Sequence, residues 1–335
     1  MKKKIKFALI GIGYWGPNVL RTLNKIKDID VKYVVDIDPD RINYVSKNFK
    51  KVIITNDLKK VLNDKEVSNI IICTPAKSHF SIAKKCLLAN KNCLIEKPAV
   101  LKISELTELN KIAKKNNLIL LSGDIYLYSK AIQKIKKLIW SKNFGKIRYF
   151  FSQRLNLGRI RNDINVIWNL ATHDISIILD CLKYKKPIQK INRSNYFLSS
   201  KLADSSYLSF KFKNNIIANI FVSWIYPEKI RKLIICGEKQ MLIFDDLKKE
   251  IYLMENKIIP IHIKNKNMEY DKRFNKKFTY IKGKSVKFNF NDDEPLLNEV
   301  EYFKKISLKQ KYSANYISGY NNTLSILNCI KSFKY

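Results

Sequence analysis

Gly11-Ile12-Gly13-Tyr14-Trp15-Gly16 is the stretch that decides the fold of this chain, because it places three glycines within six positions. The whole sequence has only nine glycines in 335 residues, so this crowding needs a reason in the backbone. Before it, residues 5–10 form a short apolar run that is typical of a buried strand. After it, residues 15–26 are predicted to form a helix, opened by Pro17 near the first turn, where the missing N–H of proline costs least. The glycines therefore lie between a strand and a helix.

A G-x-G-x-x-G turn in that position is typical of a dinucleotide-binding site. Its glycines permit a tight turn and let a pyrophosphate approach the helix N-terminus, whose N–H groups attract anions. A second predicted strand, residues 31–35, ends at Asp36. Asp36 lies twenty residues after Gly16. At about this spacing, a carboxylate accepts hydrogen bonds from the adenosine ribose and repels the 2′-phosphate of NADP. An ordinary strand–helix turn is the alternative, and Asp36 argues against it. The predicted cofactor is NAD.

Length and composition limit the class of protein. At 335 residues and 46% hydrophobic residues, the chain is long enough for two domains with buried cores. No segment approaches the roughly 20 apolar residues that span a bilayer. The basic N-terminus, residues 1–4, leads into the glycine turn rather than a cleavage site, so we expect no signal peptide and a cytoplasmic location. The six cysteines include no C-x-x-C pair, so we expect neither disulfides nor a metal site.

The formal net charge of +35 raises the question of nucleic-acid binding, because basic proteins gain affinity for phosphate backbones by counterion release. The charge comes from 55 lysines and nine arginines spread over nearly every segment. No zinc-finger or recognition-helix signature accompanies it. We therefore expect no specific nucleic-acid partner, although nonspecific adhesion at low salt is expected.

The first 122 residues alternate short apolar runs with amphipathic segments. This pattern predicts a doubly wound parallel sheet with helices on both faces. Serines are expected to cap two of the helices, Ser78–Ala89 and Ser104–Lys115. The further predicted strands are residues 52–55, 69–73, 92–95 and 118–121. Residues 1–122 are the predicted cofactor-binding domain.

From residue 123 onward the pattern changes to long neighbouring strands, which predicts an α+β domain with a large, mainly antiparallel open sheet. An open sheet face needs covering, so a homodimer or homotetramer is expected. We predict residues 265–287 to be a solvated loop or an irregular hairpin. The predicted strands are 146–157, 188–198, 205–213, 216–224, 229–236, 241–244 and 251–253, and the predicted helices are 129–140, 165–182, 295–308 and 315–332. Residues 123–335 are the predicted substrate-binding and oligomerisation domain.

Candidate chemical groups follow two strands of the first domain. Thr74-Pro75 comes after the fourth strand, with His79 one helical turn later, and Glu96-Lys97-Pro98 follows the fifth. The carboxyl ends of strands form the ligand crevice of such a sheet. Lys97 could therefore reach the nicotinamide edge as a cationic group or proton donor. The alternative is a surface lysine in a lysine-rich protein.

One of the three histidines, His173, lies on the predicted helix 165–182, with Asn169 four residues earlier and Trp168 beside that residue. Histidine titrates near neutrality, so it is suited to take a hydroxyl proton as a hydride departs. A core histidine bonded to the backbone is the alternative. His262 lies in a polar segment and is interpreted as incidental.

In combination, the glycine turn, Asp36, Thr74-Pro75 with His79, Glu96-Lys97-Pro98, and Asn169 with His173 resemble the glucose-fructose oxidoreductase, inositol dehydrogenase and rhizopine-catabolism (Gfo/Idh/MocA) family. The resemblance covers nearly the whole length. It implies a Rossmann domain, then an α/β domain, with Lys97 and His173 flanking the reacting carbon and Asn169 in support. The residues it implies for the cofactor are Gly11, Gly13, Tyr14, Trp15, Gly16, Asp36, Thr74, Pro75, His79, Glu96 and Lys97.

Three further stretches resemble the branch found with bacterial surface-sugar pathways, where nucleotide-linked amino sugars or their uronic acids are oxidised at the C3 hydroxyl. These stretches are residues 13–18, 154–159, and 223–246. Basic and amide groups suit an anionic nucleotide-sugar. The candidates for substrate contact are Tyr126, Arg154, Asn156, Arg161, Trp168 and His173.

Two positions depart from the family pattern. Relatives often have Asp where this chain has Asn169, and relatives of this branch often have His where it has Asp124. The predicted function remains NAD-dependent, reversible oxidation of the C3 hydroxyl of a UDP-linked N-acetyl amino sugar or its uronic acid. One alternative is a dehydrogenase of a free sugar or inositol. The other is a non-catalytic nucleotide-binding regulatory protein, motivated by the two departures and the basic charge.

Overall fold

The computed structural model describes residues 4–158, 160–161, 164–184, 187–198, 202–260, 278–309 and 317–331. The chain forms two compact units. Unit 1 comprises Met1–Ser129, Ile175–Tyr184 and Glu294–Tyr335, and unit 2 comprises Lys130–Asp174 and Lys185–Asp293. The first segment of unit 1 ends close to the boundary predicted at residue 123. Two later segments then return to unit 1, which a single boundary in the sequence does not describe.

Unit 1 contains a six-stranded sheet in which every neighbouring pair is parallel. Its strand order is β3-β2-β1-β4-β5-β6, so the order reverses between β1 and β4. The strands are β1 (Ile5–Ile10), β2 (Ile29–Val35), β3 (Ile53–Thr55), β4 (Val67–Ile72), β5 (Asn92–Glu96) and β6 (Leu120–Gly123). This is the predicted doubly wound arrangement, and ligands of such sheets bind at the carboxyl ends of the strands where the order reverses.

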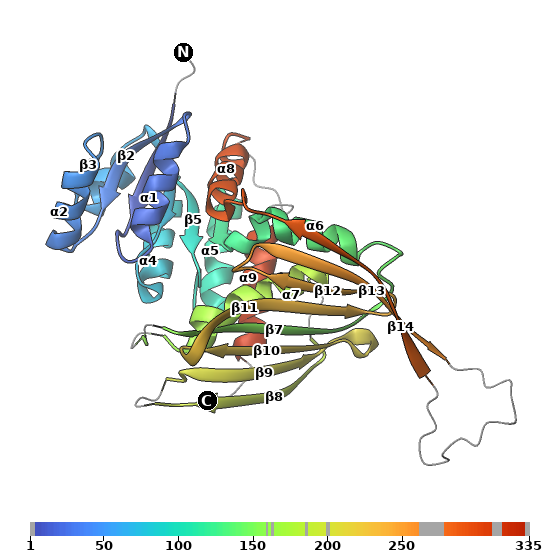
Figure 1. Cartoon of the computed structure of the whole chain (residues 1–335). Coiled ribbons are helices and arrows are strands. Elements are labelled where there is room, and N and C mark those ends of the chain that lie inside the picture. Colours follow the sequence, from blue (N-terminus) through green and yellow to red (C-terminus); the bar gives the residue numbers. More distant parts are fainter. Residues whose placement is uncertain are drawn as a thin grey trace, which may run out of the picture. The chain divides into compact units, whose positions relative to one another are not determined.

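The helices of unit 1 come from both ends of the chain. They are α1 (Gly16–Lys25), α2 (Pro39–Asn48), α3 (Leu58–Asn63), α4 (Ala76–Leu88), α5 (Ile103–Lys115), the 3-10 turn η1 (Ile125–Tyr128), α8 (Pro295–Ser307) and α9 (Ile317–Lys331). Helix α8 packs against α1 and η1 (Figure 1). Its Val300 and Phe303 join the core around Phe7, and the Phe7 and Phe303 rings meet edge to face with centroids 5.9 Å apart.

The prediction that serines cap α4 and α5 is wrong. Helix α4 begins at Ala76, directly after Pro75, and the Ser78 hydroxyl donates to the Thr74 hydroxyl oxygen at 2.8 Å. Ser104 lies inside α5, which begins one residue earlier, and the Glu105 carboxylate accepts the Lys102 N–H at 3.1 Å. Both helices begin earlier because a proline and a third-position glutamate already order their first turns.

Unit 2 contains an eight-stranded sheet in the order β14-β13-β12-β11-β7-β10-β9-β8 (Figure 1). Only the β7–β10 pair is parallel among the described strands, so the sheet is mainly antiparallel as predicted. The strands are β7 (Ile147–Leu157), β8 (Gln189–Tyr196), β9 (Ser205–Lys211), β10 (Ile217–Ser223), β11 (Ile225–Gly237), β12 (Met241–Asp245), β13 (Glu250–Pro260) and β14 (Phe278–Asn289), and a 3-10 turn η3 (Lys213–Asn215) joins β9 to β10.

Strand β14 was not predicted. It pairs antiparallel with β13, with a register shift between Met254 and Asn256, so the described part of the predicted loop or irregular hairpin is a hairpin arm with one irregularity. Residues 265–277 of that prediction lie outside the described residues. Alternating lysines in residues 278–289 leave no continuous apolar face, which is why the stretch did not read as a strand.

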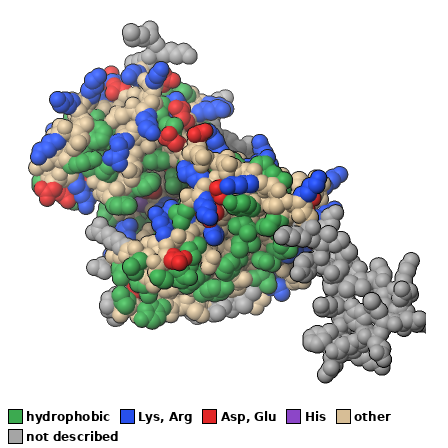
Figure 2. Space-filling model, viewed as in Figure 1, with side chains coloured by type: hydrophobic (Ala, Val, Ile, Leu, Met, Phe, Trp, Pro, Cys, Tyr) green, Lys and Arg blue, Asp and Glu red, His purple; other side chains and the backbone are tan. Residues whose placement is uncertain are grey.

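The two faces of the large sheet differ. On one face, Phe150, Ile235 and Leu242 are directly paired across β7, β11 and β12 and are fully buried. On the other, the directly paired Phe151, Ile234 and Ile243 remain partly exposed. Hydrophobic side chains accordingly gather over the part of the surface formed by this sheet (Figure 2).

Besides η3, three helical segments among the described residues belong wholly or partly to unit 2. Helix α6 (Lys130–Ile139) packs against β13. The single helix predicted for 165–182 is a π-helical turn, η2 (Ile167–Ala171), followed directly by α7 (Thr172–Cys181). No helix in the described part of the chain is both long and apolar enough to cross a membrane.

Candidate active site

The glycine turn is shaped by backbone contacts at two of its three glycines. Gly11 has φ +94°, and a Cβ there would lie 2.7 Å from the Cys73 carbonyl carbon. A Cβ at Gly16 would lie 2.5 Å from the Gly11 carbonyl oxygen. At Gly13 such an atom would meet only the Arg41 side chain, at 3.7 Å. Gly11 and Gly16 are therefore needed for the fold, whereas Gly13 leaves open space beside the turn.

Helix α1 presents its N-terminus to the same turn. Trp15 is its N-cap residue but makes no side-chain capping bond, and the first turn contains no acidic residue. The first N–H groups of a helix have no partner within the helix and attract anions. Tyr14 at the apex is 87% exposed. This arrangement fits the pyrophosphate of a dinucleotide.

Asp36 follows β2 and lies against the glycine turn. Its carboxylate is buried, and it accepts the Ile12 N–H at 2.6 Å and the Asp38 N–H at 3.0 Å. Arg41 Nη1 lies 3.8 Å from the same carboxylate. Backbone amides thus fix the orientation of the acid that the sequence predicts for the ribose. These residues fit NAD on steric and electrostatic grounds.

His79 ties together the segments that follow β4 and β5. Its ring is buried, with Nε2 2.7 Å from the Thr74 carbonyl oxygen and Nδ1 3.0 Å from the Pro98 carbonyl oxygen. Burial lowers its pKa, which favours the neutral ring. Both ring nitrogens therefore lie against the backbone on either side of the predicted site, beside Pro75 and Lys97.

Glu96 is the buried acid of the Glu-Lys-Pro segment. Its Oε2 accepts the Lys97 N–H at 3.1 Å, and its Oε1 has no hydrogen-bond partner among the described residues. Burial raises the pKa of Glu96 to about 7, against the opposing effect of the Lys97 charge. A Cβ at Gly123 would lie 3.1 Å from the Glu96 Cα and 3.2 Å from the Ile95 carbonyl oxygen, so glycine there allows β6 to lie close to the backbone of β5. The side chain of Lys97 is half-buried.

Two further buried acids lie near Glu96. Asp124, noted above as a departure from the family pattern, is buried after β6. Glu299 on α8 was missed entirely; it is fully buried, and neither carboxyl oxygen has a hydrogen-bond partner among the described residues. Burial raises its pKa well above the ordinary value, and the charges of Glu96 and Asp124 add to this. The sequence could have indicated that Glu299 is buried, because this residue lies between Leu296 and Phe303 in the apolar stripe of α8.

The second group of predicted residues lies in unit 2, on η2 and the start of α7. Asn165 Oδ1 accepts the Trp168 N–H at 3.0 Å and its carbonyl accepts the Asn169 N–H at 3.1 Å. His173 is half-buried in the first turn of α7, and Asn169 and Trp168 on the π turn are half-buried too. π-Helical turns are rare in proteins overall, and those that occur are often found at functional sites.

The predicted substrate contacts differ in their surroundings. Arg154 is buried on β7 and donates from Nε to Asp174 at 2.8 Å and from Nη2 to the other oxygen at 3.2 Å. Asn156 and Arg161 in unit 2 are half-buried, whereas Tyr126 is buried on η1 in unit 1. Asp174 was not predicted, although it follows His173 directly and lies in the buried stripe of α7.

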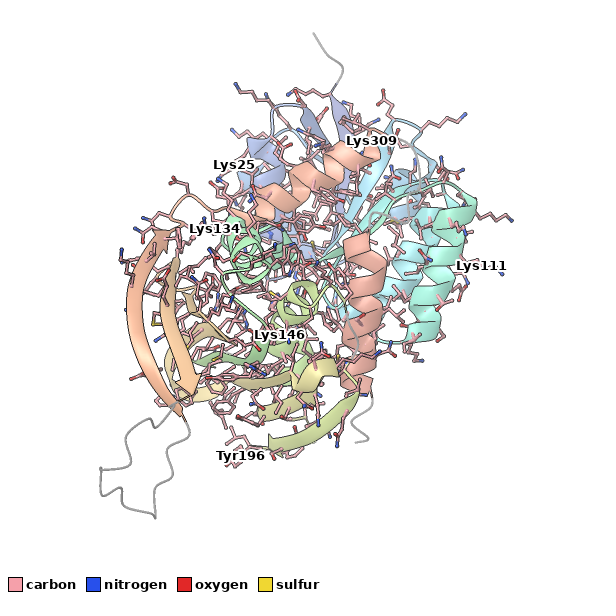
Figure 3. All side chains as sticks on the ribbon, turned by 90° about the vertical axis from the view of Figure 1, so that its right-hand side faces the viewer. Lys25, Lys111, Lys134, Lys146, Tyr196 and Lys309 are labelled. Carbon is pink, nitrogen blue, oxygen red and sulfur yellow. The ribbon has the colours of Figure 1, made fainter. Side chains whose placement is uncertain are left out.

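The described residues show no cluster of metal-ligating side chains. They contain no group of three or more His, Cys, Asp or Glu side chains that could hold a metal ion. Within unit 1 the exposed lysines lie on separate elements, as shown by Lys25 on α1, Lys111 on α5 and Lys309 after α8 (Figure 3).

The strand order, the glycine turn and the oriented Asp36 define a Rossmann domain whose residues fit NAD. The family model described as "Oxidoreductase family, NAD-binding Rossmann fold" (Gfo/Idh/MocA) matches residues 5–124. The first domain of this chain thus matches the family that its motifs resemble.

Individual relatives extend the likeness beyond the first domain. UDP-N-acetylglucosamine 3-dehydrogenase of Acidithiobacillus ferrooxidans is 29% identical over 189 residues, 56% of this chain and 58% of that protein. Inositol 2-dehydrogenase of Salmonella paratyphi B is 24% identical over 249 residues, 71% and 73% of the two chains. The match thus spans little more than half of the first relative's length.

A solved structure of the Acidithiobacillus ferrooxidans UDP-N-acetylglucosamine 3-dehydrogenase is similar to nearly the whole chain. It superposes with a TM-score of 0.76 at 21% identity, covering 97% of this chain and 96% of that one. At this identity the likeness shows the fold alone, including that of the second domain.

Proposed function

We propose that this protein catalyses NAD-dependent, reversible oxidation of a sugar hydroxyl, specifically the C3 hydroxyl of a UDP-linked N-acetyl amino sugar or its uronic acid. The observation that carries the proposal is the buried His79 ring, which lies 2.7 Å from the Thr74 carbonyl oxygen and 3.0 Å from the Pro98 carbonyl oxygen and so joins the segment after β4 to the Glu-Lys-Pro segment. The UDP-N-acetylglucosamine 3-dehydrogenase among the relatives supports the substrate class.

In this proposal the residues of unit 1 bind the cofactor and one of them assists the chemistry. Gly11, Gly13 and Gly16 with the N-terminus of α1 bind the pyrophosphate, and Asp36 binds the ribose. When bound, NAD supplies the acceptor for the hydride. The Lys97 ammonium stabilises the negative charge that develops on the substrate oxygen as the proton leaves.

In unit 2, His173 is the proposed general base. A ring nitrogen takes the hydroxyl proton, which histidine can do near neutral pH. Asn169 orients the ring or the substrate through its amide, since it cannot share a proton as an aspartate would. Trp168, Asn156 and Arg161 are the proposed contacts of the sugar or its phosphates.

The second candidate is a dehydrogenase of a free sugar or inositol, favoured by the likeness to inositol 2-dehydrogenase. Such a substrate has no nucleotide. Free UDP should therefore inhibit a nucleotide-sugar enzyme competitively and leave an inositol enzyme unaffected.

The decisive experiment is a screen of UDP-sugars, free sugars and inositols with NAD, followed by NADH absorbance. We expect turnover of a UDP-sugar that falls by at least about a hundredfold in Lys97→Ala and in His173→Ala. His262→Ala is the matched control and should retain activity. Turnover that survives His173→Ala would exclude this mechanism.

The partly exposed apolar residues on one face of the large sheet support a proposed homodimer or homotetramer. Phe151, Ile234 and Ile243 form a continuous apolar face that a second copy of the chain could cover. Ile243→Asp should reduce the mass measured by light scattering, and Lys248→Asp should not. All six cysteines are free thiols, in keeping with the reducing cytoplasm that we propose as the location.

A further inference from the structure

A buried polar cluster in unit 2 lies directly beside His173. Arg154 and Ser152 are alternate residues of β7, so both face the buried side of the sheet. Arg154 grips both oxygens of Asp174, and the Ser152 hydroxyl donates to Asp174 Oδ1 at 2.6 Å. Side-chain exposure is 6% for Arg154 and 4% for Asp174. The first turn of α7 is therefore fixed to β7 by three hydrogen bonds to one carboxylate.

This contact matters because the turn before it is irregular. Residues 167–171 are π-helical, so the regular series of i to i−4 hydrogen bonds, which still includes Asn169 N–H to the Asn165 carbonyl, is interrupted before α7 and does not by itself set the rotation of that helix. Successive helical residues point about 100° apart. Once Asp174 is fixed against the sheet, the direction in which His173 leaves the helix is fixed as well.

Stability alone does not explain such a cluster. Replacing a buried ion pair by apolar side chains is often neutral or stabilising, because removing two charges from water is costly. The same strand provides a contrast in Arg148, which pairs with Glu238 at 2.7 Å but is 61% exposed and far along β7 from the cluster. Strand β7 thus contributes to one ion pair at the surface and to a second, buried ion pair beside His173, the proposed base.

We propose that Asp174, held by Arg154 and Ser152, is a positioning residue that fixes the direction of the His173 ring for proton transfer. The inference rests on the proposed function, in which His173 is the base. It also gives Arg154 a different role from the substrate contact expected from the sequence.

The test compares Asp174→Asn and Arg154→Met, which break the pair from opposite sides. With UDP-N-acetylglucosamine and NAD as the probes, each should lower kcat/KM by about a hundredfold, chiefly through kcat, because small misplacements of catalytic groups have effects of that size. Arg154→Lys, which retains the charge, should recover part of the loss. Arg148→Met is the matched control and should behave as the unmodified protein.

A second readout needs no substrate. The chain has only three histidines, so selective ¹⁵N-histidine labelling allows the pKa of His173 to be followed by NMR, with His173→Ala assigning the signal. Asp174→Asn leaves the guanidinium unbalanced and should lower that pKa, whereas Arg154→Met leaves the carboxylate and should raise it. Arg231, which is directly paired with Arg154 across β11 and β7, and its neighbour Lys232 form ion pairs with Asp246 and Asp245 that are unchanged in both variants.

The outcomes separate the two proposals. Opposite pKa shifts with loss of kcat support the positioning role. Folded variants with an unchanged His173 pKa and unchanged kcat/KM would overturn it, even if His173→Ala is inactive. If instead His173→Ala retains full turnover, the proposed function fails, while the NMR shifts still report whether the pair acts on the ring.

Discussion

Asp174 and Glu299 are both buried carboxyl groups on helices, one in each unit, and their surroundings are opposite. The Asp174 carboxylate accepts hydrogen bonds from the Arg154 guanidinium and the Ser152 hydroxyl. Glu299 has no hydrogen-bond partner among the described residues and faces two further acids, Glu96 and Asp124. A buried acid with a cation acts as a rigid anchor. A buried acid among other acids keeps its proton instead, so unit 1 should respond to pH where unit 2 does not.

Disrupting the Arg154–Asp174 ion pair should have the largest effect on stability. Arg154→Met leaves the Asp174 carboxylate buried without its cation, so the free energy of unfolding should fall by about 3–5 kcal/mol. Urea denaturation measures this. The exposed Arg148→Met should lower it by less than about 1 kcal/mol. Equal losses would mean that burial does not distinguish the two pairs.

The acid cluster should make stability depend on pH in the direction opposite to that of most carboxylates. The pKa of Glu96 rises from 4.5 in the unfolded chain to about 7 in the folded one, so the folded state binds the proton more tightly. Stability is then greatest below pH 4.5 and falls as pH rises through 7, by about 3 kcal/mol.

Glu96→Gln should abolish this contribution, since glutamine resembles the protonated acid. The difference in unfolding free energy between variant and unmodified protein, measured in urea at pH 4.5 and pH 8, should grow in favour of the variant. A difference that stays constant would show that Glu96 does not titrate in this range.

Asp36 is an intermediate case, a buried acid held by backbone N–H groups. Asp36→Ser should weaken NAD binding about tenfold or more, because hydrogen bonds to charged groups are worth about 1.5–3 kcal/mol. Affinity for NADP should rise, since Arg41 remains beside the turn. Fluorescence titration with both cofactors measures the change, with the exposed Asp40→Ser as control.

The smallest expected effect is that of Glu299→Gln. Glu299 holds its proton more tightly than Glu96 and is neutral while Glu96 titrates, so this variant should shift the pKa of Glu96 by less than about half a unit. The midpoint of the pH-dependent stability loss should therefore stay nearly in place, and a larger shift would show that Glu299 is charged. Glu301→Gln on the exposed side of α8 should leave the midpoint where it is.

The sequence predicted the parts of the molecule in which local pattern and tertiary structure agree. Gly11, Asp36 and Lys97 stand at strand ends, where the spacing of apolar runs already defines the topology. The serine caps failed because Pro75 and Glu105 start their helices earlier, and both alternatives are compatible with the same residues. The prediction of function from the catalytic pair remains to be tested.

Glu299 and Asp174 were missed for a shared reason. Each is an acid within the apolar stripe of an amphipathic helix, and a pattern search treats such a residue as an interruption. What decides its role is the partner opposite, Arg154 in one case and Glu96 in the other, and no local pattern contains a partner so distant along the chain.

The return of α8 to unit 1 has a consequence for the order of folding. The core around Phe7 is completed by Val300 and Phe303, so β1 is made by the ribosome long before the helix that covers it. Both segments of unit 2 are synthesised between these two parts of unit 1. The apolar surface of the nascent first domain stays uncovered meanwhile, and such surface favours aggregation. A chain interrupted before Pro295 should therefore depend on chaperones, whatever the state of its cofactor site.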